Sequence, residues 1–371
     1  MKILVHGLSS QRGGVESFLL DYCTRMIASS GHAFDFVLYG TGIPDYADGL
    51  QSLGCVFHTV VPRTSDPIKN RIQLSELVSS GKYDLVWFNA CTLSDVSLLK
   101  AAKRCGVPCV LHSHNSSPMG NGINAFLHRL HKTGVSNLFE YGIACSDYAA
   151  EFMFPDECRL GNRCRVIPNA VECDRFRYRE EQRQAIRGEL GLGDSLVLGH
   201  VGRFTEQKNH AYLLKVFAEV KRTVSDARLM LLGTGPLEAH VADAARELGF
   251  GNDVIFVGSV SDAYRYYSAM DCFVFPSIYE GMPLALLEAQ ASGLPCVVAD
   301  AISPMSFVLK NISVLSLSVD PAKWAAAVFE GLRGDGNREW AADYLASNGY
   351  GIDESASAVL NILLQSVSSG Q

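Results

Sequence analysis

The segment that decides the fold runs from Cys272 to Glu288 and reads CFVFPSIYEGMPLALLE. Its first four residues are apolar and predict a buried strand over 272–275. A turn with a carboxylate and a glycine follows, and Pro283 then stands where the first residue of a helix is expected. The segment therefore predicts a strand, a tight turn and a helix, which together form the basic unit of parallel α/β sheets.

Short apolar runs alternate with amphipathic segments along almost the whole chain. The runs that predict strands are 3–6, 34–38, 56–60, 85–88, 109–112, 142–145, 165–167, 196–201, 228–232, 254–257, 272–275, 295–298 and 313–315. The segments that predict helices are 15–29, 72–79, 94–104, 209–223, 236–248, 283–292 and 352–366. Because this alternation builds parallel sheets that are covered on both faces, the predicted fold class is α/β.

The highly charged segment 171–194 interrupts the alternation once. We expect a link between two domains there. The predicted domains are 1–175, on which the tail 352–371 packs back, and 176–351, each with a doubly wound, Rossmann-like sheet. Since open α/β sheets bind ligands at the carboxyl ends of their strands, the two domains are expected to face each other across a cleft.

The composition excludes several classes of protein. Of 371 residues, 48% are hydrophobic and 19% charged, so the chain can bury a large core and is not disordered. A net charge of −7 argues against a nucleic-acid partner. The 11 cysteines lie mostly in apolar runs without a C-x-x-C pair, which predicts reduced thiols and a cytoplasmic protein. The sequence contains no signal-peptide pattern and no apolar run long enough to predict a transmembrane helix.

Glycine-bearing turns follow the predicted strands at the ends where ligands bind. Gly13 and Gly14 open the first helix, where a backbone without side chains can approach an anion. Gly202 precedes Arg203 and Lys208, two cations that can stabilise a departing diphosphate. The alternatives are an ordinary tight turn for the glycine pair and a solvated basic loop for the cations.

Two further strand-end turns carry little side-chain chemistry. One contains Gly233, Thr234 and Gly235, and the other contains Val260. Both can surround a nucleobase with backbone groups, although each is also an ordinary signal for the start of a helix.

A pair of histidines follows the predicted strand at 109–112. His114 is expected to contact a hydroxyl or a leaving phosphate, because it stands at the carboxyl end of that strand. The alternative is that His112 and His114 are bonded to loop backbone. A zinc site is not expected, because no third ligand is near in the sequence.

Two acids flank the turn in the opening segment. Glu280 lies in the turn, and Glu288 lies in the helix that follows. A helix start after a glycine turn offers N–H groups to phosphate, and carboxylates accept hydrogen bonds from hydroxyls. Together they suit a nucleotide sugar. Taken singly, Glu280 and Glu288 are also explained as acids near the start and on the surface of a helix.

In the combination of these motifs, the chain resembles the GT-B-fold retaining glycosyltransferases of family 4. The motifs that carry the resemblance are Gly13-Gly14, 112–115, Ile167-Pro168-Asn169-Ala170-Val171, Gly202-Arg203 with Lys208, and Glu280-x7-Glu288 followed by 293–298. The resemblance covers nearly the whole length. The sequences of segments 14–18 and 112–115 are most similar to those of family members that assemble capsular or exopolysaccharide repeat units.

The resemblance implies a role for each matching residue. Arg203 and Lys208 would hold the diphosphate, and Glu288 would hold the ribose hydroxyls. Glu280 would hold the donor sugar, with His114 contacting the same sugar. The backbone beside the donor would come from Gly13, Gly14, Gly202, Thr234, Gly235, Val260, Gly281, Met282 and Leu284.

The resemblance also implies the reaction and its participants. A hexose would pass with retention from a nucleotide sugar, with a UDP-sugar favoured, to a glycan or lipid-linked glycan, without a metal or cofactor. The protein would be cytoplasmic. Residues 123–138 mix apolar and basic side chains, and they are expected either to contact the inner face of the plasma membrane or to form an ordinary amphipathic helix.

Two other functions stay open. One is a nucleotide-sugar 2-epimerase of the same fold, although no acid/base constellation for the sugar's C2 stands out in the sequence. The other is a non-catalytic partner in a synthase complex that binds a nucleotide sugar, although such a partner would usually have lost one of the residues Arg203, Lys208, Glu280 and Glu288.

Overall fold

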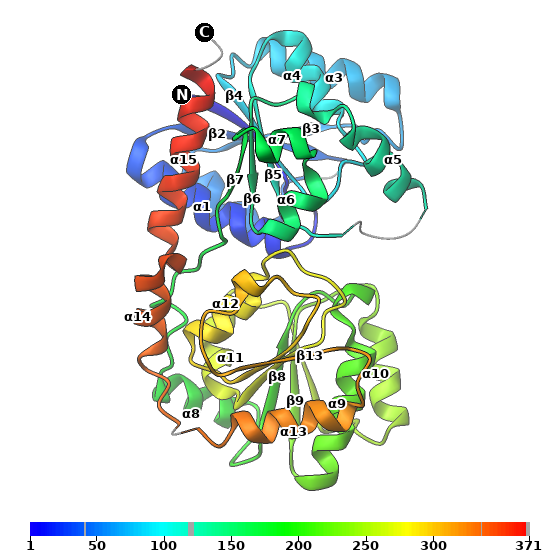
Figure 1. The fold of residues 1–371 in the computed structure, drawn as a ribbon, viewed down its shortest axis with the longest axis vertical. Helices are drawn as coiled ribbons and strands as arrows, with labels where there is room; N and C mark the ends of the chain where they lie inside the picture. Colours follow the sequence, from blue (N-terminus) through cyan, green and yellow to red (C-terminus); the bar gives the residue numbers. More distant parts are fainter. Residues whose placement is uncertain (41, 118–121, 335, 369–371) are drawn as a thin grey trace. The chain divides into compact units, whose positions relative to one another are not determined.

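The computed structural model describes residues 1–40, 42–117, 122–334 and 336–368. The chain divides into two compact units, each built on one parallel sheet (Figure 1). The first unit consists of Met1–Asn169 and Ile352–Gln371, and the second of Ala170–Gly351. The chain therefore passes from one unit to the other twice.

The first unit contains a seven-stranded parallel sheet with the order β3-β2-β1-β4-β5-β6-β7. Its strands are β1 (Lys2–His6), β2 (Ala33–Tyr39), β3 (Val56–Val60), β4 (Leu85–Ala90), β5 (Cys109–Ser113), β6 (Tyr141–Ala144) and β7 (Cys164–Val166). The order reverses between β1 and β4, which is the switch point where doubly wound sheets bind ligands. β4 and β5 are buried throughout, so the core of this unit lies around them.

The helices of the first unit follow its strands. They are α1 (Gly14–Ser30), α2 (Asp48–Ser52), α3 (Pro67–Ser80), α4 (Ser97–Cys105), α5 (Ile123–Lys132), α6 (Asp147–Met153), α7 (Asp156–Leu160) and, from the end of the chain, α15 (Ile352–Ser368). α15 lies beside α1 (Figure 1), and Tyr22 Oη is 2.7 Å from Ser355 Oγ across this contact. Arg25 of α1 and Asp353 of α15 form an ion pair of 3.0 Å.

The second unit contains a six-stranded parallel sheet with the order β10-β9-β8-β11-β12-β13. Its strands are β8 (Val197–Val201), β9 (Arg228–Leu232), β10 (Val254–Gly258), β11 (Cys272–Phe275), β12 (Cys296–Ala299) and β13 (Ile312–Leu315). This sheet reverses its order between β8 and β11. The opening sequence segment forms β11, as its apolar run predicts, and β11 is fully buried.

The helices of the second unit are shorter on average than those of the first. They are α8 (Glu180–Glu189), α9 (His210–Thr223), α10 (Glu238–Glu247), α11 (Ala263–Ala269), α12 (Leu284–Ala291), α13 (Pro321–Gly331) and α14 (Ala341–Leu345). Trp324 of α13 and Phe217 of α9 are fully buried, so these helices close the core of this unit.

The charged segment 171–194 begins just after the point where the two units divide. It contains α8, which packs within the second unit, and Arg183 and Arg187 of α8 both form ion pairs with Asp271. The units divide at Asn169 and Ala170, because Val171 already pairs with Gly351 in the second unit. High charge in this segment therefore marks a helix held by arginines and not a flexible connection.

No helix in the described part of the chain is long and apolar enough to cross a membrane.

Candidate active site

The loops after β8 and β9 lie backbone against backbone. A Cβ at Gly233, whose φ is +126°, would lie 2.2 Å from the carbonyl oxygen of Gly202, and a Cβ at Gly235 would lie 2.6 Å from that of Phe204. The Phe204 N–H donates to the Thr234 carbonyl over 3.0 Å. Only glycine fits such an approach, so these predicted glycines fix the edge of the site.

Lys208 and Glu280 form an ion pair at this edge. The Lys208 Nζ is 2.6 Å from the Glu280 Oε1, and the two side chains are only 15% and 9% exposed. The same Nζ lies 4.5 Å from the centre of the Phe275 ring. The Lys208 stem runs past Gly202, where a Cβ would lie 3.0 Å from the Lys208 Cε. The structure thus brings Gly202 and Lys208 of one predicted motif together with Glu280 of another.

Two hydrogen bonds join the loop that carries Lys208 to the loop that carries Glu280. The Gln207 Nε2 donates to the Tyr279 carbonyl over 3.0 Å, and the Ile278 N–H donates to the Gln207 carbonyl over 2.8 Å. Asn209, in the left-handed region at φ +54°, caps α9 by accepting from the Tyr212 N–H. Lys208 is therefore placed from both sides, and its ammonium group is preorganised.

The helix after β11 begins one residue later than the sequence predicts. Pro283 is the N-cap and not the first helical residue, because its ψ of 122° is extended and its carbonyl accepts from the Leu286 N–H. Gly281, Met282 and Leu284 are buried around this start. The first turn of a helix leaves N–H groups without partners inside the helix, so α12 can bind an anion there.

Glu288 is half-buried in α12. Its Oε2 accepts a hydrogen bond of 2.6 Å from Tyr267 Oη, and the buried Tyr267 ring lies on α11. Burial, together with the Glu288 carboxylate, raises the pKa of Tyr267. The tyrosine therefore stays a donor and orients the carboxylate.

The other predicted residues of this unit lie on loops at the same edge. Arg203 and Thr234 are exposed, and Val260 is half-buried in the turn after β10. Arg203 and Lys208 both lie at the carboxyl end of β8, and Lys208 forms the ion pair with Glu280.

In the first unit, the turn after β1 surrounds a buried acid. Gly13 is the N-cap of α1, and a Cβ there would lie 2.9 Å from the Glu16 Oε2. Ser9 Oγ donates to Glu16 Oε1 over 2.6 Å. Gly14 has open space where a side chain would stand, so a ligand can approach its backbone.

His114 is held by a side chain and not by loop backbone. Its Nε2 is 2.9 Å from the Oδ1 of Asn89, at the end of β4. Its ring stacks on His112 with centres 4.2 Å apart and meets the edge of Phe18. Burial lowers the pKa of His114 to about 3, so the ring is neutral near pH 7. Both ring nitrogens of His112 are buried, and neither has a hydrogen-bond partner among the residues that the structure describes.

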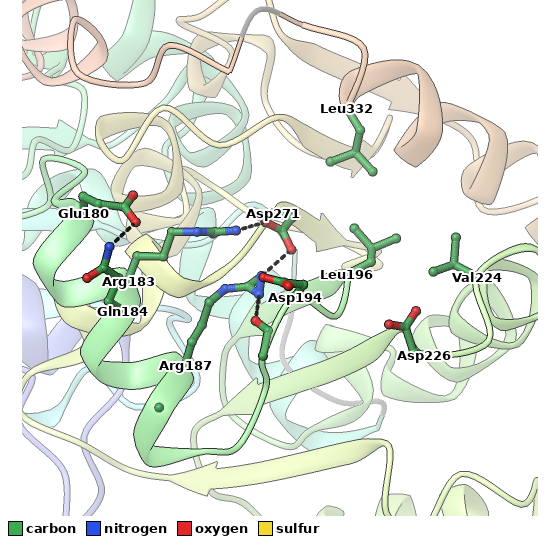
Figure 2. A pocket seen from close by; sticks show the side chains of 12 residues that line it. Glu180, Arg183, Gln184, Arg187, Asp194, Leu196, Val224, Asp226, Asp271 and Leu332 are labelled. Atoms are coloured by element: carbon green, nitrogen blue, oxygen red, sulfur yellow. Dashed lines mark hydrogen bonds and ion pairs between the residues drawn. The ribbon is translucent and has the colours of Figure 1, made fainter.

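An open pocket of about 700 Å³ lies at the opposite edge of the second unit's sheet. Figure 2 shows the side chains that line it. Leu196 and Asp271, which precede β8 and β11, line it together with Arg183 and Arg187. Each arginine lies 2.7 Å from an Asp271 oxygen, so the charges are already paired within the protein. We therefore place the active site at the loops after β8 and β11 and not in this pocket.

Among the described residues, no group of three or more His, Cys, Asp or Glu side chains is arranged to hold a metal ion.

Sequence reasoning missed Asn89, Gln207 and Tyr267. Each of these side chains forms a hydrogen bond with a predicted residue or its loop. The bonded residues are far apart in the sequence, so the sequence does not show the contact. A signal exists for Asn89, which is the polar residue in the apolar run LVWFNA. Tyr267 lies in a tyrosine-rich segment, and its sequence context is that of an ordinary core residue.

The chain matches two family models. Residues 12–175 match the model described as Glycosyltransferase Family 4, and residues 195–333 match the one described as Glycosyl transferases group 1. The putative glycosyltransferase EpsF of Bacillus subtilis (strain 168) is 32% identical over 97% of this chain and 96% of its own length. An Escherichia coli UDP-Gal:alpha-D-GlcNAc-diphosphoundecaprenol alpha-1,3-galactosyltransferase is 27% identical over 66% of this chain and 64% of its own length.

Solved structures give the same assignment of the fold. HepE of Anabaena, in complex with UDP and glucose, superposes with a TM-score of 0.81 at 19% identity over 98% of this chain and 100% of its own. WaaG, a glycosyltransferase involved in lipopolysaccharide biosynthesis, superposes with a TM-score of 0.72 at 13% identity over 97% and 99%. These likenesses confirm the predicted GT-B fold.

Proposed function

This chain belongs to the family 4 glycosyltransferases of group 1, as its motifs predict, and on that premise we propose that it is a retaining hexosyltransferase. The donor is a UDP-sugar, and the acceptor is a glycan or lipid-linked glycan in the assembly of a surface polysaccharide. The observation that carries the proposal is the buried Lys208–Glu280 pair beside the start of α12. The likeness to EpsF supports the exopolysaccharide role.

The second unit supplies the groups that the donor requires. Lys208 and Arg203 bind the diphosphate, and the N–H groups around Gly281, Met282 and Leu284 add further donors. Glu288, oriented by Tyr267, accepts from the ribose hydroxyls. Glu280 accepts from the donor sugar. The backbone of Gly202, Thr234, Gly235 and Val260 surrounds the nucleoside. In the first unit, Gly13, Gly14 and His114 stay predictions for the diphosphate and the sugar.

The proposed reaction exchanges one glycosidic bond for another. The bond between the anomeric carbon and the diphosphate oxygen breaks, and a bond to an acceptor hydroxyl oxygen forms on the same face. The hydroxyl proton passes to the leaving diphosphate oxygen. Negative charge grows on the diphosphate, so the protein acts mainly by preorganised cations and N–H donors. No step requires a metal ion or a dedicated protein base.

The test is a transfer assay with purified protein, radiolabelled UDP-sugars and undecaprenyl-linked acceptors. We expect UDP release to depend on acceptor, EDTA to leave the rate within twofold, and the product to keep the donor's anomeric configuration by NMR. Epimerisation of UDP-GlcNAc at C2 without acceptor, or loss of turnover in EDTA, would contradict the proposal. Nucleotide-sugar binding without turnover under any of these conditions would favour a non-catalytic partner.

We also propose that the protein works in the cytoplasm and meets its lipid-linked acceptor at the inner face of the plasma membrane, through residues 123–138. Ile123, Phe126 and Leu130 of α5 are 77%, 65% and 56% exposed, and their spacing places them on one face. Residues 96–139 contain five Lys or Arg and no Asp or Glu, in a chain of net charge −7. An apolar row beside basic residues suits an anionic bilayer.

Phe126→Ser is expected to weaken binding to vesicles of phosphatidylglycerol and phosphatidylcholine. Losing one buried aromatic contact with the lipid lowers the partition constant about tenfold. The measurement is co-sedimentation with the vesicles at two salt concentrations. Leu248→Ser, at an exposed leucine of the second unit, is the matched control and is expected to change nothing. Binding that is equal on pure phosphatidylcholine, or no binding at all, would remove this part of the proposal.

A further inference from the structure

We infer that Asn89 is a positioning residue that keeps the proton of His114 on Nε2, so that Nδ1 is offered to the donor sugar as a hydrogen-bond acceptor. Only the last step, the contact with the sugar, rests on the proposed function. The placement of the proton follows from contacts within the first unit alone.

Asn89 lies where three neighbouring strands of the first unit meet. It is the second-last residue of β4 and is 1% exposed. β4 pairs with β1 on one side and with β5 on the other, and the strand order reverses between β1 and β4. Doubly wound sheets bind their ligands at such a reversal. A buried polar residue at this place therefore stands directly beneath a ligand position.

The backbone of Asn89 fixes its neighbour on β1. The His6 Nδ1 lies 2.9 Å from the Asn89 carbonyl oxygen, and the ring of His6 stacks on Phe88 with centres 4.1 Å apart. Gly7, at φ +139°, leaves room for this contact, because a Cβ there would lie 2.9 Å from the Asn89 Cβ. These contacts with His6 and Gly7 fix the position of the Asn89 backbone.

The side chain of Asn89 has one orientation. Its Nδ2 donates to the Trp87 carbonyl over 3.4 Å, which turns Oδ1 toward the Nε2 of His114 at 2.9 Å. An amide oxygen only accepts, so the Nε2 of His114 donates and carries a proton. A rotated amide would set its oxygen against the Trp87 carbonyl oxygen, where both atoms only accept, and would lose the bond to Trp87.

The ring of His114 carries only this one proton near neutral pH. Burial against His112 and Phe18 disfavours the imidazolium, and it lowers the pKa to about 3. With the single proton on Nε2, the Nδ1 holds a lone pair. A neutral ring in this tautomer accepts a hydrogen bond from a sugar hydroxyl at Nδ1 and cannot act as a general acid from that atom.

The test compares two substitutions of Asn89. Asn89→Leu keeps the branched shape of the side chain and removes the acceptor, whereas Asn89→Asp keeps an acceptor oxygen at the same place. Long-range ¹H–¹⁵N spectra of histidine-labelled protein, assigned with His114→Gln, report which ring nitrogen is protonated. We expect Nε2 protonation in the wild type and in Asn89→Asp, and loss of this preference in Asn89→Leu.

Affinity gives the second readout. We expect Asn89→Leu to weaken binding of UDP-glucose about tenfold while binding of UDP changes less than twofold, because only the sugar contact depends on His114. Asn70→Leu is the matched control, since Asn70 is also a fully buried asparagine of the first unit. It is expected to lower the melting temperature without changing either the tautomer or the ratio of the two affinities.

Each other outcome overturns the inference at a defined step. A wild-type proton on Nδ1, or an unchanged tautomer in Asn89→Leu, removes the role of Asn89, whatever the activity. A changed tautomer with an unchanged ratio of UDP-glucose to UDP affinity would show that His114 does not contact the donor sugar. In that case the proposed role of His114 is wrong, while the transfer assay with the wild type still tests the proposed function.

Discussion

Lys208→Ala is expected to lower the rate of sugar transfer about 100- to 1000-fold, which is the typical cost of removing one preorganised charge-stabilising group. Lys208 is set for this role before any ligand binds. Its loop is bonded to the loop after β11, and its ammonium lies between the Glu280 carboxylate and the Phe275 ring. The measurement is kcat under saturating donor.

The same substitution is expected to reduce stability, and a second variant separates the two effects. Without Lys208, the buried Glu280 has lost its counter-charge, and the free energy of unfolding falls by about 3 kcal/mol. Lys208→Ala combined with Glu280→Gln leaves no unpaired charge, so most of this loss is recovered while transfer stays low. Transfer by Lys208→Ala within threefold of the wild type would contradict the assignment of the diphosphate cation.

Asp271→Ala is expected to cause the largest loss of stability at a position remote from the chemistry. Asp271 accepts from Arg183 and from Arg187, each over 2.7 Å (Figure 2). It also accepts from the Val197 N–H over 2.7 Å. Removing the carboxylate leaves two arginines, 23% and 9% exposed, without their counter-charge. Breaking such a buried ion pair costs about 3 kcal/mol or more.

Thermal melting and amide hydrogen exchange at the start of β8 measure this effect. The kcat of the surviving protein below its melting temperature is expected to stay within twofold, because the cluster lies at the sheet edge opposite Lys208. Asp226→Asn, at the same pocket, is the matched control and is expected to change neither quantity. A normal melting temperature for Asp271→Ala would show that the arginines find other partners.

The strands were predictable because their signal is local. A short apolar run bounded by turn residues, such as 272–275, is typical of a buried strand, and β11 forms there with both ends as predicted. The glycines were predictable for the same reason, since Gly233 and Gly235 stand where two backbones approach too closely for any side chain. Their neighbours along the chain were enough to identify them.

The contacts that orient the site were not predictable, because they join residues far apart in the sequence. The charge of segment 171–194 suggests a solvent-exposed link when only its neighbours in the sequence are considered. The residue that pairs with Arg187 is Asp271, which lies 84 residues further along the chain. Tyr267 has no feature that points to Glu288, and Lys208 has none that points to Glu280 more than to any other acid. The residue types therefore identify the side chains that can bind a ligand, whereas the fold is needed to show which of them contact one another.

The place of α15 beside α1 has a consequence for biosynthesis. The first unit is discontinuous, because its last helix follows the whole of the second unit in the chain. On the ribosome, the second unit can complete its sheet while the first still lacks the partner of Tyr22 and Arg25. The first part of the chain to emerge is therefore the last to be finished. A nascent chain that stops at Gly351 would leave the face of α1 that α15 covers exposed to chaperones.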